Sequence, residues 1–454
     1  MHFQSFRATS TFEGTLKGDF ATLDEAGFPE IPPNQLVVSS HLFILYTKPP
    51  MSSHPQSLPG LPPGITSRII AVNDLDVYIL ESKPTASVFQ TNKSPLLVLL
   101  HGFPEFCYSW RKVMVPLAQQ GYFVVAPDQR GFGQTTLRRY SESTTTPLSG
   151  YGRDGKMIKF DDDLTPFGLL NMAADIVSLV HVLGYTSVAG IIGHDYGSRV
   201  ASYCALIRPD LFKSVVIMSA PFTGTPSLSE TDLTVKPFIH LLNDQLAVLD
   251  PPRKHYMMYY STPEANADMS DPDGLHTFLR TYFHVKSGDW GQNSGVRELE
   301  PSALSMSTIP YYYIMPLSES MPSCLAPFTP TKDEIEQNKW LPEAELAVYV
   351  SQYAQTGFQG GLNSYRCLTD PQRWAQDTRI FHGKQITIPA MFLFGACDWG
   401  VYQFPGAVNV MRTKACSNMK NEDFVLVEGA GHWVQQEKPE VVVKNLLRFL
   451  EKIV

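Results

Sequence analysis

The sequence has no excess of positive charge and no long apolar run, and each absence excludes a class of protein. Its 454 residues include 36 Lys and Arg against 44 Asp and Glu, giving a net charge of −8. No basic surface is therefore expected that could hold a nucleic-acid backbone. No segment reaches the roughly 20 apolar residues that span a bilayer, and residues 1–14 lack the apolar core of a secretory signal. We expect a cytoplasmic protein without an integral membrane segment.

Cysteines are also few, and their spacing is uninformative. The six cysteines lie far apart, and none belongs to a Cys-x-x-Cys or Cys/His ligand pattern. Neither a disulfide scaffold nor a zinc site is suggested, so we expect reduced thiols and no metal or organic cofactor. What the chain does contain is 43% hydrophobic residues over a length sufficient for one large domain with a substantial insertion.

Apolar patterning predicts where ordered structure begins. Residues 1–62 are polar and rich in Pro and Ser, which predicts a loosely docked N-terminal extension. Order is expected near Ile65, where apolar and polar residues alternate on both sides of Asn73-Asp74, a favourable two-residue hairpin turn. Short apolar runs then alternate with helical stretches, as in a parallel sheet buried on both faces. We expect strands at 96–100, 123–127, 188–192, 214–218, 391–395 and 424–428.

The alternation of strands and helices stops between Pro221 and Arg379. The intervening block is rich in aromatic residues and Met, with helical segments and no strong strand signal. An insertion at this point would cover the carboxyl ends of the strands, where ligand sites of such sheets lie. We therefore predict an α/β fold with a mostly parallel sheet flanked by helices and an inserted helical cap. Its core would comprise residues 63–221 and 379–454, with a helical cap over 222–378.

The strongest local motif is Gly193-His194-Asp195-Tyr196-Gly197, which follows an apolar strand and opens a helical run. This is the context of a nucleophile elbow, a strained turn that holds its central side chain above the sheet. Here that side chain is Asp195, a carboxylate that is ionised at neutral pH without help from a base. Attack on a saturated carbon would give an ester, and hydrolysing that ester requires water activated by a base.

A matching acid and base follow in the expected order. Asp398 comes after the strand at 391–395, and His432 comes after the strand at 424–428. Singly, these residues would be interpreted as a helix cap and a surface histidine, but three such residues at strand ends predict a catalytic triad. The turn after the strand at 96–100 supplies one N–H of an oxyanion hole, so we assign that pair to the backbone of Phe103 and Tyr196.

Several motifs resemble those of the epoxide hydrolases of the α/β-hydrolase superfamily. The resemblance runs from about Ile65 to the C-terminus and departs over 137–164. It is carried by HGFPE at 101–105, DQRGFGQT at 128–135, GHDYG at 193–197, GACDWG at 395–400 and GHWVQQEKP at 431–439.

The resemblance implies a two-step reaction with no cofactor. Asp195 would open the epoxide, and His432, oriented by Asp398, would activate water against the resulting ester. The late cap segment resembles the one that supplies a ring-opening tyrosine, here Tyr365, and the early segment HYMMYY supplies its partner, Tyr256. Residues expected to contact substrate are Tyr259, which could replace Tyr256, together with Pro104 and Trp399.

Two other functions are weighed against this one. Dehalogenases use the same aspartate elbow, but haloalkane enzymes follow the nucleophile with Trp and fluoroacetate enzymes with Arg, whereas this chain has Tyr196. A non-catalytic binding protein on the same fold would need only the pocket. We therefore predict hydrolysis of a small apolar epoxide by water, and the sequence leaves a homodimer open. His194 is expected to pack or bond to backbone, and Arg199 to pair with a local carboxylate.

Overall fold

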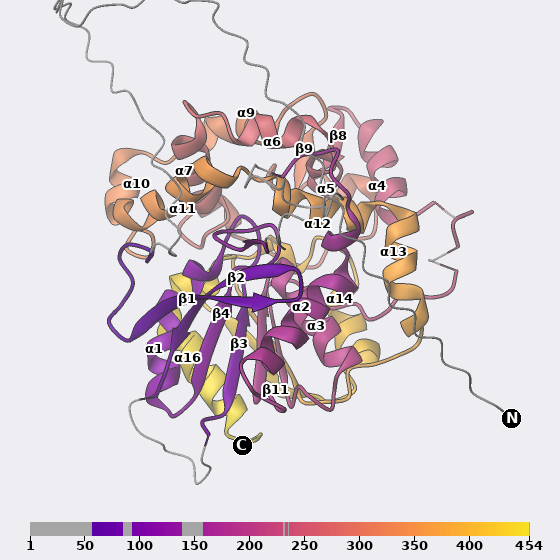
Figure 1. Cartoon of the computed structure of the whole chain (residues 1–454). Coiled ribbons are helices and arrows are strands. Elements are labelled where there is room, and N and C mark those ends of the chain that lie inside the picture. Colours follow the sequence, from indigo (N-terminus) through magenta and orange to yellow (C-terminus); the bar gives the residue numbers. More distant parts are fainter. Residues whose placement is uncertain (1–56, 85–92, 139–157, 230–231, 235, 454) are drawn as a thin grey trace, which may run out of the picture. The chain divides into compact units, whose positions relative to one another are not determined.

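The short apolar runs of the sequence form one nine-stranded sheet (Figure 1). The computed structural model describes residues 57–84, 93–138, 158–229, 232–234 and 236–453, and all structural statements concern these. Strands β4, β3, β6, β7, β10 and β11 are parallel neighbours in that order, and β2 and β1 extend the β4 edge antiparallel. The bounds are β1 Ile65–Val72, β2 Leu75–Ser82, β3 Leu96–Leu100, β4 Phe123–Pro127, β5 Thr136–Leu137, β6 Gly190–His194, β7 Val215–Met218, β10 Ala390–Gly395 and β11 Met419–Val427.

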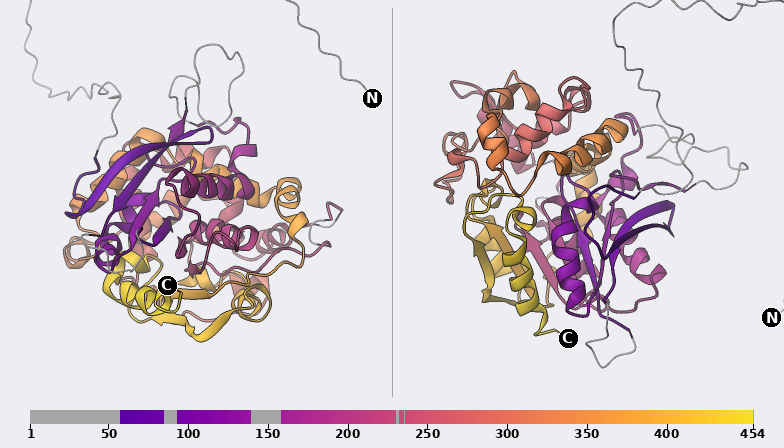
Figure 2. Two further views of the ribbon diagram at one scale, coloured as in Figure 1. Left: turned by 60° about the horizontal axis from the view of Figure 1, so that its bottom comes forward. Right: turned by 90° about the vertical axis from the view of Figure 1, so that its left-hand side faces the viewer.

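Helices cover the two faces of this sheet, which explains the continuous apolar strands. Every residue of β3, β4 and β6 is buried. Helix α1 (Arg111–Gln119) packs against α16 (Pro439–Leu450), and α2 (Leu169–Val182) packs against α3 (Tyr196–Ile207) (Figure 2). Strands covered on both sides bury apolar side chains at every position rather than at alternate ones.

A group of helices lies between β7 and β10 in the sequence and gathers at one end of the sheet (Figure 1). The segment also contains a two-stranded antiparallel sheet, so the expectation of purely helical structure is wrong there. These strands have only three residues each, too short for an alternating pattern to mark them. The bounds are α4 Phe238–Ala247, β8 Arg253–His255, α5 Tyr256–Tyr260, α6 Glu264–Met269, α7 Leu275–Val285, α8 Ala303–Met306, β9 Ile314–Pro316, α9 Met321–Leu325, α10 Lys332–Gln337, α11 Glu343–Thr356, α12 Gln359–Thr369 and α13 Pro371–Thr378.

The structure confirms the predicted hairpin and shifts some strand bounds. Val72 pairs with Leu75 across Asn73-Asp74, as a two-residue turn requires. The strand expected at 188–192 lies at 190–194, because parallel pairing with β7 continues to His194 while Val188 makes only an isolated bridge. Leu58, assigned to the extension, is buried in the core. Residues 1–56 lie outside the described residues, and the domain bounds at 221/222 and 378/379 stay predictions.

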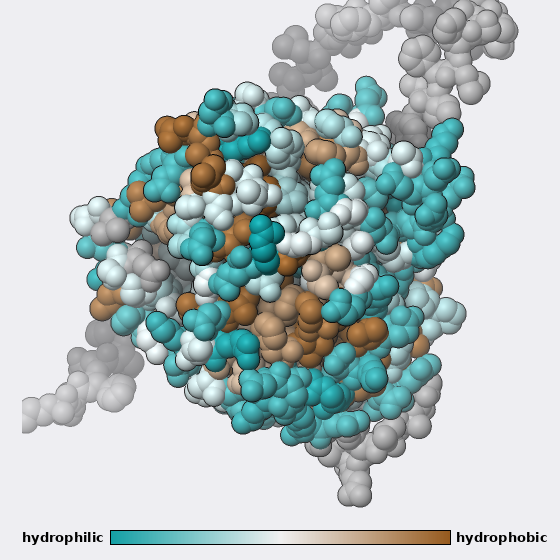
Figure 3. Space-filling model, turned by 180° about the vertical axis from the view of Figure 1, so that it is seen from behind, coloured by the Kyte–Doolittle hydropathy of each residue, from teal (hydrophilic) through white to brown (hydrophobic). Residues whose placement is uncertain are grey.

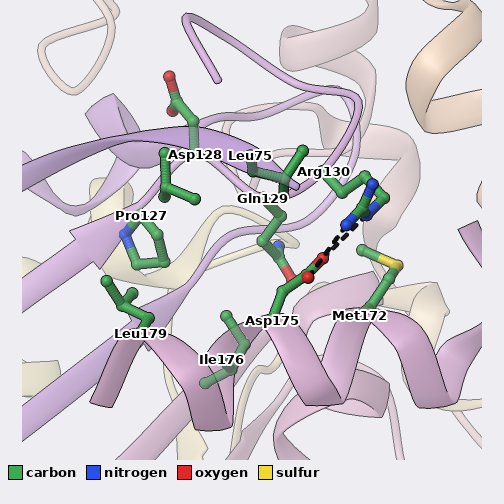
Figure 4. A pocket seen from close by; sticks show the side chains of 10 residues that line it. Leu75, Pro127, Asp128, Gln129, Arg130, Met172, Asp175, Ile176 and Leu179 are labelled. Carbon is green, nitrogen blue, oxygen red and sulfur yellow. Dashed lines mark hydrogen bonds and ion pairs between the residues drawn. The ribbon is translucent and has the colours of Figure 1, made fainter. Parts of the chain in front are cut away.

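A buried ion pair ties the first hairpin to α2. The Arg130 guanidinium donates to Asp175 at 2.8 Å and to Asp74 at 2.6 Å. It borders a cavity of about 10 Å³, the space of one water molecule, which is also lined by Leu75 and Met172 (Figure 4). The two carboxylates compensate the buried charge, so the network holds the turn that follows β4.

The surface mixes apolar and polar side chains. On the face opposite to that of Figure 1, apolar residues lie in groups between hydrophilic ones (Figure 3). The most exposed large apolar side chains in the described ranges are Val248, Ile380 and Leu304. Within the same ranges, no helix combines the length and apolar character needed to cross a bilayer.

Candidate active site

Asp195 occupies a strained turn between β6 and α3. Its φ of 51° and ψ of −118° lie outside the ordinary region for a residue with a side chain. The turn is possible because its flanks are glycines: a Cβ at Gly193 would collide with the carbonyl of Gly197, and one at Gly197 would collide with that of Leu100. The strand therefore ends in a side chain directed beyond the sheet.

His432 and Asp398 stand behind this carboxylate. The Nε2 atom of His432 lies 3.4 Å from Oδ2 of Asp195, and its Nδ1 lies 3.1 Å from both carboxylate oxygens of Asp398. Because carboxylate oxygens only accept, Nδ1 donates to Asp398, and in the neutral form of the ring Nε2 carries the lone pair. Nε2 is buried and has no hydrogen-bond partner in the described chain, so it can receive a proton from water.

The neighbours of Asp195 keep it ionised. Burial alone would raise the pKa of this carboxyl group, but the interaction with His432 and the positive charges of Lys286 and His194 outweigh burial and hold the pKa below its usual value. The backbone N–H of Phe103 donates to Oδ1 at 3.0 Å. Tyr196 is the first residue of α3, so its backbone N–H has no acceptor within the helix and can serve as the second donor. Oδ2 is left on the side of His432.

Two phenols from the inserted segment share a cavity with Asp195. Tyr256 begins α5 and Tyr365 lies in α12, and their ring centroids are 5.9 Å apart. Burial raises the pKa of both phenols, and the charge of Asp195 raises them further, so both remain proton donors at neutral pH. The cavity measures about 20 Å³ and is lined by Asp195, Tyr196, Arg199, Ala220, Tyr256, Met257, Tyr365, Leu368 and Gln403.

A buried lysine contributes charge beneath this site. Lys286 is only 2% exposed, and its Nζ lies 4.6 Å from the Tyr313 ring centroid and 5.1 Å from that of Tyr282. Burial lowers its pKa to about 8, against the opposing charges of Asp195, Asp398 and Glu105. Its carbonyl oxygen accepts the His432 backbone N–H at 2.8 Å, so this residue also fixes the loop that carries the histidine.

A second buried ion pair, Glu105 with His194, was missed by the sequence analysis. His194 Nδ1 lies 2.6 Å from the Glu105 carboxylate, and Nε2 lies 2.7 Å from the carbonyl oxygen of His432. Both partners are acceptors, so both ring nitrogens donate and the ring is positively charged. Burial would lower the His194 pKa, but the Glu105 charge raises it. The sequence places a Glu and a His in two of the active-site motifs, but these residues are 89 positions apart, and no local pattern indicates that they are in contact.

Three residues predicted to contact substrate, Tyr259, Pro104 and Trp399, are not among those that line the cavity, and the roles of Pro104 and Trp399 stay predictions. The Tyr259 hydroxyl donates to Asp268 at 2.8 Å, which directs it away from the site. The next residue, Tyr260, packs its ring 5.2 Å from that of Tyr256 instead. The expectation that Tyr259 could replace Tyr256 is therefore wrong, because Tyr260 continues the face of Tyr256.

Comparison with known proteins points in one direction. Residues 95–250 match the family model described as the alpha/beta hydrolase fold. The chain is 28% identical to epoxide hydrolase A of Mycobacterium tuberculosis, covering 85% of this chain and 97% of the relative. It is 28% identical to epoxide hydrolase 3 of Siraitia grosvenorii, covering 79% and 92%. A solved epoxide hydrolase from an endophytic Streptomyces superposes with a TM-score of 0.65 at 25% identity, covering 86% of this chain and 96% of the other.

Proposed function

The chain belongs to the epoxide hydrolase family of the α/β-hydrolase superfamily, and from this premise we propose that it converts an epoxide into a vicinal diol through a covalent aspartyl ester. One observation carries the proposal: the Asp195 carboxylate shares a single cavity with the phenols of Tyr256 and Tyr365, while His432 lies 3.4 Å away. The substrates are an epoxide and water.

In the first step, Oδ2 of Asp195 attacks a ring carbon and the carbon–oxygen bond of the epoxide breaks. The departing oxygen is an alkoxide, which is strongly basic and needs a proton. Tyr256 and Tyr365 face the carboxylate across the cavity, and their raised pKa values keep these protons available. The step leaves an ester on Asp195 and a hydroxyl group on the neighbouring carbon.

In the second step, His432 removes a proton from water and the hydroxide attacks the carbonyl carbon of the ester. As the tetrahedral intermediate collapses, the departing oxygen takes up a proton and leaves as the second alcohol of the diol, and the Asp195 carboxylate is restored with one oxygen from water. The remaining proton of the second step returns to the tyrosinate that the first step left, which restores both the phenol and the neutral His432. Asp398 stabilises the imidazolium that forms. The N–H groups of Phe103 and Tyr196 would stabilise the oxyanion, each with about 3 kcal/mol.

Each alternative function leaves some groups of the site without a role. A halide leaves without a proton, so a dehalogenase needs no acidic phenols opposite the carboxylate. A binding protein would need neither the free Nε2 of His432 nor its link to Asp398. Epoxide opening uses all of these groups.

The deciding experiment is a panel of epoxides, fluoroacetate and 1-bromobutane, assayed for diol and halide release. Diol formation should be abolished in Asp195→Asn and reduced about 100-fold or more in the Tyr256→Phe, Tyr365→Phe double variant. Tyr259→Phe is the matched control, since that hydroxyl bonds to Asp268, and it should retain activity. A single turnover in ¹⁸O-water should place the label in Asp195. Halide release without diol would make the protein a dehalogenase.

On the basis of the sequence we also propose a cytoplasmic location and a homodimer. We further propose that residues 222–378 form a cap inserted between core segments at 63–221 and 379–454. Cell fractionation, and sedimentation at two protein concentrations, would test the first two.

A further inference from the structure

Arg199 is a charged side chain in the active-site cavity that the proposed reaction does not use. It lies in the first turn of α3, the helix that begins directly after Asp195. It lines the cavity together with Asp195, Tyr256 and Tyr365. A guanidinium group stays protonated at any physiological pH. The cavity therefore holds a permanent positive charge beside the nucleophile.

The structure gives this guanidinium no carboxylate partner. Within the described parts of the chain, Arg199 forms neither an ion pair nor a side-chain hydrogen bond, contrary to the expectation of a local pair. Asp377 is near enough to influence the neighbouring Tyr196, but its carboxylate accepts the backbone N–H of Leu169 at 2.6 Å. Arg208, at the other end of α3, is by contrast paired with Asp210. An unpaired arginine facing a cavity is available to a ligand.

We propose that Arg199 binds a carboxylate group of the substrate, so that the epoxide is a short epoxy acid. This inference rests on the proposed function and names its substrate class. Guanidinium and carboxylate form two parallel charge-assisted hydrogen bonds, which fixes orientation as well as affinity. Met257 and Leu368 line the same cavity and offer apolar contact to the carbon chain.

The geometry also limits the length of this substrate. The side chains of Asp195 and Arg199 line one small cavity. The ring carbon attacked by Asp195 and the carboxylate held by Arg199 must therefore be separated by only a few bonds. The cavity of about 20 Å³ has the space of one or two water molecules, so its lining must move apart even for a short substrate. A four-carbon acid such as 3,4-epoxybutanoate has the required functional groups.

The test compares 3,4-epoxybutanoate with 3,4-epoxybutanamide, which has the same size and no charge. For the wild-type protein, kcat/KM should be about 10- to 100-fold higher for the acid, as expected for hydrogen bonds to a charged group. This ratio should fall as salt is added. In Arg199→Gln the ratio should approach 1, while Arg199→Lys should keep part of it. Arg208→Gln, at the far end of α3 and paired with Asp210, should leave the ratio unchanged.

Distinct results separate failure of this inference from failure of the proposed function. Equal hydrolysis of acid and amide by the wild type, or an equal loss of both in Arg199→Gln, would overturn the role of Arg199 and leave epoxide hydrolysis standing. Absence of diol from every epoxide, acid or neutral, would overturn the proposed function itself. Butanoate should also inhibit competitively and more strongly than butanamide, a measurement that needs no variant.

Discussion

Replacing Lys286 by Met should make the protein more stable at pH 7. Burial lowers the pKa of this amine from 10.5 to about 8, so at pH 7 the folded protein holds a charge that it disfavours. The difference of about 2.5 pH units, at 1.36 kcal/mol each, corresponds to about 3 kcal/mol. Cation–π contacts with rings such as Tyr313 oppose this by about 2 kcal/mol. The net gain is about 1 kcal/mol, or about 2 °C in Tm.

The advantage of Lys286→Met should shrink as the pH rises. Below pH 8 the amine is protonated in both states, so the full cost of burying its charge is present. Between pH 8 and 10.5 the folded protein loses the proton first, the unfolded chain binds more protons, and the stability of the wild type rises with pH. The stability difference between wild type and variant should therefore decline over this window.

Scanning calorimetry from pH 7 to pH 10.5 measures this difference. Lys384→Met is the control, because that side chain is exposed and its replacement should give a difference independent of pH in this window. A lower Tm of Lys286→Met at pH 7, or a difference that does not change between pH 8 and 10.5, would refute the reasoning.

Three further changes test the packing around the site. Gly193→Ala should abolish activity and lower Tm, because its Cβ would meet the Gly197 carbonyl; normal turnover would contradict the elbow geometry. Arg130→Met should cost about 3–5 kcal/mol in urea unfolding because it leaves the buried carboxylate of Asp175 unpaired, with kcat retained. Glu105→Gln should lower Tm at pH 7. The Glu105 pKa is lowered by its partners against burial, so the deficit should shrink as the pH falls through the folded pKa, and a constant deficit would exclude this electrostatic origin.

Sequence pattern was sufficient for the sheet and for the order of the triad positions. The apolar runs and the Asn73-Asp74 turn are local signals, and each strand end fixes where the next residue must project. Because parallel strands end at the same edge, Asp195, Asp398 and His432 could be expected together, and the structure brings them within 3.4 Å. The roles of these residues remain part of the proposal.

Long-range contacts could not be predicted in the same way. Glu105 and His194 are 89 residues apart, and only the fold shows that a carboxylate neutralises the ring. Lys286 follows an ordinary amphipathic helix, and its burial depends on rings from other segments. The choice between Tyr256 and Tyr259 depended on which side of a five-residue helix faces the cavity. A helix this short gives too few positions for periodicity to decide.

Arg199 shows what sequence spacing and structure each contribute to specificity. The position of Arg199 on the helix after the elbow is visible in the sequence, but only the structure shows that it lines the cavity. Spacing cannot say whether an acid from another segment neutralises the arginine, and the nearby Asp377 lies 178 residues away. Its carboxylate is engaged by a backbone N–H, which leaves the guanidinium to the cavity. A positive charge in the cavity of the nucleophile would then select epoxides that carry an anionic group, a preference that the aromatic-rich insertion alone does not indicate.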